Sequence, residues 1–158
     1  MKKEEKTNVM RILEQKKVAY RSYCYADTDA VGGVDVARVL GQDPKQVFKT
    51  LVTTGGKTGK NIVFVIPVEA ELDLKKAAKA VLEKSIEMIK QKDLLPTTGY
   101  IHGGCSPIGM KKLFETVVDE TALNFDTIIF SAGKVGYQVE VSPSDLIKVI
   151  PYKTADII

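Results

Sequence analysis

One glycine-rich stretch, GYIHGGCSPIGMKK at positions 99–112, constrains the fold of this chain more than any other segment. It contains four of the twelve glycines, one of the two cysteines and the only histidine. Glycine adopts backbone conformations that other residues avoid, and it lets a ligand approach the main chain. Pro107 fixes its own φ and biases Ser106 toward an extended shape. The stretch predicts a constrained loop with exposed N–H groups, which suits either an anion- or carbonyl-binding loop or a tight turn between two elements.

The composition limits the class of protein. A chain of 158 residues with 44% hydrophobic and 27% charged residues predicts one globular domain, which we place at 1–158. A net charge of +3 is too small to indicate nucleic-acid binding by itself. Two cysteines without a CxxC pattern exclude a disulfide framework and fit a reducing, cytoplasmic setting.

Neither a leader nor a membrane span is expected. Residues 2–6 are all charged, and no apolar stretch follows them, so we expect no signal peptide. The longest apolar run, 62–68, is far too short to cross a bilayer.

Hydrophobic patterning predicts a mixture of short strands and helices. Strands are expected at 19–25, 47–54, 62–66, 85–88, 116–118, 127–130 and 137–141, and helices or helical turns at 8–17, 35–40, 73–82, 92–95, 120–123 and 142–145. The run 62–66 has no polar alternation, which predicts a central strand covered on both faces, and Gly41 is expected to stop the helix at 35–40. Short glycine loops join several strand pairs, and only antiparallel neighbours permit such connections. The expected class is α+β, with a mixed, largely antiparallel sheet that curls toward a barrel and is flanked by short helices.

Two of the expected helices carry specific signals. Asp73 caps a helix whose apolar stripe we assign to Leu74, Ala77, Ala78, Val81 and Leu82. Its lysines form either a solvated face or a phosphate-facing surface for the acceptor stem of a tRNA. The turn at 92–95 is expected to end at Pro96.

Metal and thiol chemistry have little support in the sequence. Cys24, His102 and Cys105 supply too few ligands for a structural zinc site, which needs four, so we expect no metal. A Cys105–His102 nucleophile lacks the third, orienting group, and a small buried thiol is the preferred interpretation of Cys105.

Lys49 and Ser131 are better candidates, although each has an ordinary structural explanation. Lys49 sits among apolar residues of an expected strand, where a lysine either protects a sheet edge or projects into a cleft. Ser131 opens the glycine loop 131–136, where a serine either caps local backbone or contacts a ligand.

Three segments in the right order resemble the YbaK/EbsC family of aminoacyl-tRNA deacylases, which edit mischarged tRNA, chiefly Cys-tRNA(Pro). They are Phe48-Lys49-Thr50-Leu51, the stretch 99–112 and Ser131-Ala132-Gly133-Lys134-x-Gly136. The similarity runs from about residue 8 to residue 157. It implies a barrel-like mixed sheet with a site in a cleft between loops, and it implies no cofactor.

The resemblance also implies the site residues. The catalytic set would be Lys49, Gly103, Gly104 and Ser131, and the substrate- or tRNA-binding set Tyr25, Thr50, Ser106, Pro107, Gly133 and Lys134. Lys49 would hold the 3′ adenosine or the substrate carbonyl, the two glycines would donate N–H groups to that carbonyl, and Ser131 would orient the amino acid.

The chain departs from the family pattern at several positions. Cys105 stands where the family usually has an aliphatic residue, and His102 at a place that the family does not use in catalysis. Val135 replaces a second basic residue that often follows the lysine of the third motif, and Gly32 stands where an aromatic residue can occur. The departure at Val135 puts the strength of some tRNA contacts in doubt.

The implied mechanism needs no protein nucleophile. The cysteine thiol of the substrate would attack its own ester carbonyl, and tRNA would leave. The alternatives are hydrolysis of Ala-tRNA(Pro) by water and a non-catalytic tRNA- or synthetase-binding module. The expected partners are the 3′ end of aminoacylated tRNA and prolyl-tRNA synthetase, with the protein a monomer or weak dimer that binds no membrane.

Overall fold

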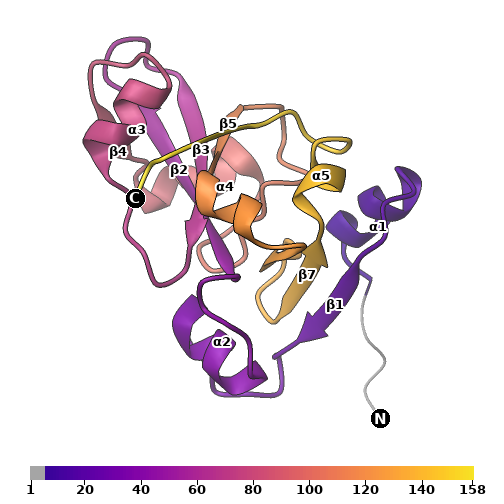
Figure 1. Cartoon of the computed structure of the whole chain (residues 1–158). Helices are drawn as coiled ribbons and strands as arrows, with labels where there is room; N and C mark the ends of the chain where they lie inside the picture. The colour runs from indigo at the N-terminus through magenta and orange to yellow at the C-terminus, as the bar shows by residue number, and fades with distance from the viewer. Residues whose placement is uncertain (1–5) are drawn as a thin grey trace.

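The computed structural model describes residues 6–158, which form two β-sheets and several short helices (Figure 1). The first sheet has the strand order β1-β7-β6, with β1 (Arg21–Cys24), β6 (Ile128–Ser131) and β7 (Tyr137–Val141). The second has the order β4-β2-β3-β5-β8, with β2 (Phe48–Gly55), β3 (Asn61–Pro67), β4 (Ile86–Met88), β5 (Glu115–Asp119) and β8 (Lys153–Ala155). The helices are α1 (Asn8–Gln15), α2 (Gly33–Leu40), α3 (Leu74–Ala80), α4 (Gln91–Thr98), α5 (Pro143–Leu146) and the 3-10 helix η1 (Glu120–Asn124).

The predicted α+β class with a mixed, largely antiparallel sheet is confirmed. All pairings in the first sheet are antiparallel, as are β2–β3 and β2–β4, whereas β3–β5 and β5–β8 are parallel. The two sheets meet at a parallel bridge between Val47 and Ile129, where the Ile129 N–H donates to the Gln46 carbonyl at 3.1 Å. They therefore enclose one shared interior, which is how the predicted curl of the sheet is realised.

The main hydrophobic core fills this interior. Phe48 and Val52 of β2 contribute to it together with Phe130 of β6 and Val139 of β7, and Leu13 of α1 covers one side. β3 was predicted to be a central strand because its residues lack polar alternation. That prediction is confirmed, since Ile62–Ile66 are at most 2% exposed and β3 lies between β2 and β5.

α2 packs against the open face of the first sheet and ends where the sequence predicts. Gly41 adopts a left-handed conformation, with φ +68°, and closes the helix. Ala37 of α2 packs with Val47, Val68 and Ile129, so the helix covers the bridge between the two sheets. In Figure 1, α2 lies at the bottom of the view, below β2 on one side and β1 and β7 on the other.

Three details differ from the sequence-based expectations. The apolar stripe of α3 excludes Leu74 and Leu82, which are 45% and 85% exposed, because Leu82 follows the helix with φ +58° and turns outward. α4 continues past Pro96 to Thr98, since the Thr98 hydroxyl donates to the Leu94 carbonyl and the Gly99 N–H donates to the Leu95 carbonyl. β8 was not predicted, because Lys-Thr-Ala carries no strand pattern and the strand exists only through parallel pairing with β5.

The expectation about a signal peptide rests largely on residues 1–5, which lie outside the described residues. Within residues 6–158, no helix is both long and apolar enough to cross a membrane.

Candidate active site

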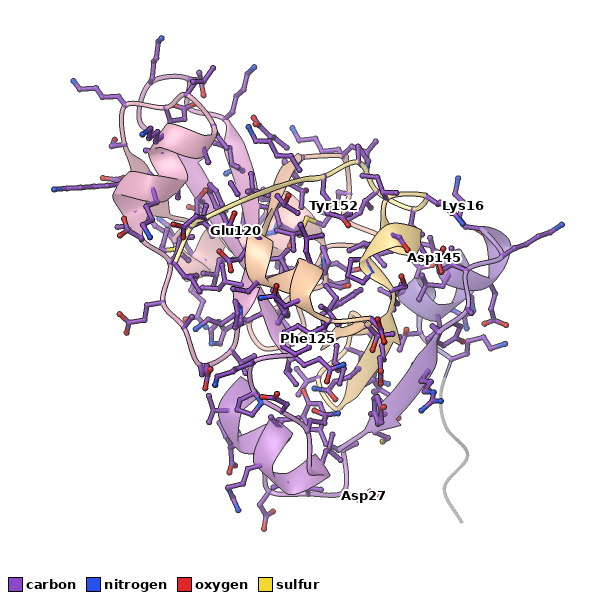
Figure 2. All side chains as sticks on the ribbon, viewed as in Figure 1. Lys16, Asp27, Glu120, Phe125, Asp145 and Tyr152 are labelled. Carbon is purple, nitrogen blue, oxygen red and sulfur yellow. The ribbon has the colours of Figure 1, made fainter. Side chains whose placement is uncertain are left out.

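A cleft of about 760 Å³ opens between the two sheets. Its volume lies within the range of small-molecule sites. One wall is β2 from Val47 to Val52, and the opposite wall includes Ser131 of β6 and Gln138 of β7. The lining is completed by the loop between β1 and α2, the start of α4 and the glycine-rich stretch 99–112, which we call the central loop. Asp27, labelled in Figure 2, marks the β1–α2 loop at the bottom of the view, beside α2.

Five of the ten predicted site residues line this cleft. They are Tyr25, Lys49, Thr50, Gly103 and Ser131. They come from four separate parts of the chain, so the fold brings residues that are distant in sequence into one cleft. The other five, Gly104, Ser106, Pro107, Gly133 and Lys134, are not part of the lining and lie in the two loops behind it.

Lys49 projects from β2 as a partly buried side chain in the cleft. β3 pairs with β2 from Phe48 to Thr54, whereas β4 pairs only with Thr53–Gly55, so at Lys49 the second edge of the strand has no strand partner among residues 6–158. This unpaired stretch lines the cleft, so Lys49 lies both at an open strand edge and in the cleft. Among residues 6–158, no carboxylate forms an ion pair with it, whereas Lys76, Lys148 and Lys153 each have one. The described cleft lining also contains no Asp or Glu. Lys49 is therefore a cation available to an anionic or strongly dipolar ligand.

The central loop is held rigid from behind. The Tyr100 hydroxyl donates to the Ile108 carbonyl at 2.5 Å, and the Ile108 N–H donates to the hydroxyl oxygen of Ser106 at 3.3 Å. Ser106 and Pro107 are buried, and Pro107 faces a separate, smaller cavity of about 220 Å³ lined mainly by apolar residues. Ser106 and Pro107 thus shape the loop rather than line the cleft.

The two glycines expected to donate N–H groups differ in the structure. The N–H of Gly104 already donates to the Ile101 carbonyl at 3.0 Å, so it is not available to a substrate. The N–H of Gly103 has no acceptor within the described part of the chain, and Gly103 lines the cleft with φ +85°. Of the expected pair, only Gly103 retains a donor for a carbonyl oxygen.

The glycine loop 131–136 fixes Ser131. The Gly133 N–H donates to the Ser131 oxygen at 3.1 Å, which leaves the serine O–H to donate elsewhere. Gly133 itself has φ +89° and lies against Tyr100 and Val9, so a side chain there would collide with the support of the central loop. The ammonium of Lys134 lies 5.5 Å from the centre of the Tyr137 ring.

Gln138 lines the cleft, and the sequence-based analysis did not select it as a candidate. It pairs directly with Ser131 across the β6–β7 ladder, so the two side chains share one face of the sheet. It is only 5% exposed, and its side-chain oxygen accepts a hydrogen bond from Gln42 Nε2 at 2.9 Å. A glutamine in an alternating strand is the only signal in the sequence, and it does not distinguish a surface position from a cleft floor.

Two buried oxygens near the cleft have no hydrogen-bond partner among residues 6–158: Oγ1 of Thr50 and Oε1 of Gln42. Unpaired buried polar atoms are uncommon in folded proteins and often mark a site for water or ligand. Thr50 faces the cleft from β2, and Gln42 lies next to Gln138. Spare hydrogen-bonding capacity therefore lies in the β2 wall, at Thr50, and behind the opposite wall, at Gln42, which does not itself line the cleft.

The two chemically reactive side chains of the central loop differ in environment. His102 is exposed and lines the cleft. Cys105 also lines the cleft but is largely buried, and this burial raises the pKa of its thiol to about 12. The Cys105 thiol therefore stays protonated at neutral pH and is a poor nucleophile. No group of three or more His, Cys, Asp or Glu side chains able to hold a metal ion occurs among the residues described.

Comparison with known proteins identifies relatives over nearly the whole chain. The sequence model of the family described as "Aminoacyl-tRNA editing domain" matches residues 28–149. A protein of Enterococcus faecalis (strain ATCC 700802 / V583), named "Putative Cys-tRNA(Pro)/Cys-tRNA(Cys) deacylase EbsC", is 50% identical over 157 residues. That alignment covers 99% of this chain and 95% of the relative.

Solved structures with the same fold are more distant in sequence. The crystal structure of hypothetical protein APE2540 superposes with a TM-score of 0.85 at 20% identity, covering 94% of this chain and 97% of that one. The "Crystal structure of a putative trans-editing enzyme for prolyl tRNA synthetase" has a TM-score of 0.79 at 22% identity, covering 94% and 93%. At these identities the superpositions establish the fold alone.

Proposed function

This chain belongs to the aminoacyl-tRNA editing domain family, and from that premise we propose that it deacylates mischarged cysteinyl-tRNA, chiefly Cys-tRNA(Pro). The whole chain, 1–158, would act as one editing domain. The half-identical relative from Enterococcus faecalis is named for Cys-tRNA(Pro) and Cys-tRNA(Cys), so Cys-tRNA(Cys) is included as a second substrate.

The observation that carries this proposal is the charge of the cleft. Lys49 lies in a cleft whose described lining has no carboxylate, and within residues 6–158 it has no ion-pair partner. The aminoacylated 3′ end of tRNA combines a phosphate backbone with an ester whose carbonyl oxygen becomes negative during deacylation. A single unpaired ammonium beside spare hydrogen-bond donors suits such a ligand.

In the proposed complex Lys49 holds the 3′-terminal nucleotide or the ester oxygen, and the Gly103 N–H donates to the carbonyl oxygen. The Ser131 hydroxyl and the Gln138 amide orient the amino acid from the opposite wall. Tyr25 and Thr50 complete the pocket. Ser106, Pro107 and Gly133 act indirectly by holding the loops, and Lys134 contributes positive charge near the cleft.

The chemistry follows from an ester that is already activated. The substrate thiol forms a bond from its sulfur to the ester carbonyl carbon, the bond from that carbon to the ribose oxygen breaks, and tRNA leaves. The product is a cyclic thioester of cysteine, which water hydrolyses. Positioning and stabilisation of the oxyanion are the main contributions required of the protein, and the buried, protonated Cys105 has no part in the bond changes.

The proposed partners are aminoacyl-tRNA and prolyl-tRNA synthetase, the enzyme that generates the mischarged product. We infer that the protein acts in the cytoplasm, where it would meet that product. A +3 net charge gives only a weak general attraction to tRNA, so a bound synthetase would raise the local concentration of substrate.

The test is a deacylation assay with tRNA charged with cysteine, serine or alanine. Cys-tRNA should be deacylated far faster than Ser-tRNA, because a hydroxyl of similar size enters the same pocket but is a much poorer nucleophile near neutral pH. Pocket size alone separates near-isosteric groups by only about 1–3 kcal/mol. Equal rates with Cys-tRNA and Ser-tRNA would exclude attack by the substrate thiol. Preference for Ala-tRNA would identify water as the nucleophile, and no deacylation of any substrate would leave a non-catalytic binding module.

A further inference from the structure

The proposed reaction requires a group that takes up a proton. Only a few per cent of an ordinary thiol is thiolate at pH 7. For the sulfur to attack at a useful rate, a base in the cleft must accept its proton, and an acid must then supply one to the departing ribose oxygen. Attack by the substrate's own thiol removes the need for a protein nucleophile, but it does not remove the need for this proton transfer.

The described cleft lining offers few groups for this task. Its titratable side chains are Tyr25, Lys49, His102 and Cys105, and it contains no Asp or Glu. Lysine and tyrosine ordinarily hold their protons at neutral pH. Burial keeps the Cys105 thiol protonated as well, with a pKa of about 12. Of these four side chains, His102 carries the imidazole, the group that proteins use most often as a general acid and base.

The position of His102 is compatible with this role. It directly precedes Gly103, whose N–H points to no acceptor within residues 6–158 and is the proposed carbonyl donor. Both residues line the cleft, so the imidazole and the proposed carbonyl donor open onto the same space. His102 is also exposed, so it can exchange protons with water between turnovers.

Because the proposed function requires this proton transfer, we propose that His102 is a catalytic residue that accepts the thiol proton of the bound cysteinyl ester. The proton moves from the substrate sulfur to a ring nitrogen of His102, and the sulfur then forms its bond to the carbonyl carbon. When the carbon–oxygen bond of the ester breaks, the imidazolium returns the proton to the ribose oxygen of tRNA. The proton that leaves the thiol is the one that the ribose oxygen receives, so atoms and charge balance over the reaction and no cofactor is needed.

Several other charged groups lie around His102. Lys49 on β2 shares the cleft, and Tyr25 and Cys105 are the other titratable side chains in its lining. The loop 131–136 packs against Gly103 and Gly104 through Val135 and the backbone of Lys134, which brings Lys134 to the same side of the cleft. The amino group of the substrate is the remaining candidate base, and the test must separate it from His102.

The test measures single-turnover deacylation of Cys-tRNA(Pro) from pH 5 to pH 9 for the wild type and for His102→Gln. We expect the wild-type rate to rise with pH through an inflection between pH 5 and 8. The His102→Gln variant should lose this inflection and be at least about tenfold slower at pH 7, which is a modest effect for a general base. Added imidazole should restore part of the lost rate.

Ile101→Gln is the matched control, because Ile101 is the neighbouring exposed side chain and does not line the cleft. It should retain the wild-type rate and pH profile. The same assay with N-acetyl-Cys-tRNA removes the substrate amine, and the inflection should remain. An unchanged rate and profile in His102→Gln, or loss of the inflection with the N-acetylated substrate, would overturn the role of His102.

In either case an active wild type would leave the proposed deacylase function intact, whereas an inactive wild type would reject that function.

Discussion

Gln42 Nε2 donates a hydrogen bond to Gln138 Oε1 at 2.9 Å, which links the segment after α2 to the strand β7 across 96 positions of sequence. Gln138 is 5% exposed and lines the cleft directly opposite Ser131 in the β-ladder. The hydrogen bond therefore holds the orientation of a polar side chain on the floor of the proposed site. Because Gln42 follows the glycine that ends α2, the boundary of the helix sets the position of this contact.

This relationship predicts coupling between the two residues. Gln42→Leu should leave Gln138 Oε1 buried without a donor, a loss of about 1–3 kcal/mol, partly offset because the unpaired Oε1 of Gln42 is removed as well. The Gln42→Leu/Gln138→Leu double variant should be more stable than the sum of the single effects predicts. Chemical denaturation of all four proteins measures this coupling, and strict additivity would mean that the hydrogen bond contributes nothing.

Lys49→Ala should lower deacylation of Cys-tRNA(Pro) by at least one order of magnitude. A well-placed electrostatic contact in a catalytic site contributes roughly 2.7–4 kcal/mol to stabilisation of the transition state. The fold should be little affected, because no ion pair to Lys49 is lost among the residues described.

Lys60→Ala is the matched control for Lys49, since Lys60 is an exposed lysine that precedes the neighbouring strand β3 and lies outside the cleft. It removes the same charge, so it should reduce nonspecific attraction to tRNA equally. If Lys49→Ala proves as active as Lys60→Ala, the proposed pocket must be rejected.

The fold was largely predictable from the sequence because its elements are marked by local signals. Gly41 at the end of α2 and the apolar run 62–66 within β3 each follow from residue chemistry and were predicted. β8 could not be predicted, because three unpatterned residues form a strand only where β5 offers an open edge. The exposure of Leu82 likewise depends on a left-handed backbone that apolar periodicity does not reveal.

The candidate site was less predictable than the fold. The motif residues Lys49, Gly103 and Ser131 line one cleft, whereas Gln138 belongs to no motif and was missed. The motif residues Ser106 and Gly133 hold the loops instead of lining the cleft. The sequence motifs group residues that line the cleft with residues that support its loops, and only the packing separates the two.

Cys105→Ala and Cys24→Ala should each retain most of the deacylase activity, because the proposed nucleophile belongs to the substrate. Both cysteines are free in the structure, and the Cys105 thiol is protonated at neutral pH. Rates per folded molecule, with folding checked by circular dichroism, provide the measurement. A large loss in Cys105→Ala with an intact fold would instead indicate a protein thiolate.

Cys105 also predicts a pH dependence of stability. Burial raises the pKa of its thiol in the folded protein to about 12, above the ordinary value of 9.0, so between these values the folded state binds more protons than the unfolded state. The resulting stabilisation is complete below about pH 9 and is lost as the pH rises toward 12. Unfolding free energies measured from pH 8 to pH 11 should fall less steeply for Cys105→Ala than for the wild type. Burial and, to a smaller extent, the charge of Cys105 also raise the pKa of Tyr100 to about 12, so Cys105→Ala removes part of the Tyr100 contribution as well and changes the slope in the same direction.

The two glycines of the central loop should respond differently to substitution by alanine. Gly103 has φ +85°, so an alanine there is strained by about 1–2 kcal/mol, and the relaxation of this strain would redirect the one N–H still available to a carbonyl oxygen. The Gly104 N–H is already bonded to Ile101, and Gly104 does not require a positive φ. A Cβ at position 104 would meet the Val135 backbone nitrogen at 3.2 Å, so Gly104→Ala should lower stability by pressing on the loop 131–136.

We therefore expect Gly103→Ala to lose most of its activity per folded molecule, and Gly104→Ala to lose stability while its folded fraction keeps most of its activity. Single-turnover rates together with thermal denaturation of both variants separate the two effects. The opposite pattern, with Gly104→Ala inactive and Gly103→Ala active, would mean that the substrate carbonyl is bound by a different part of the loop.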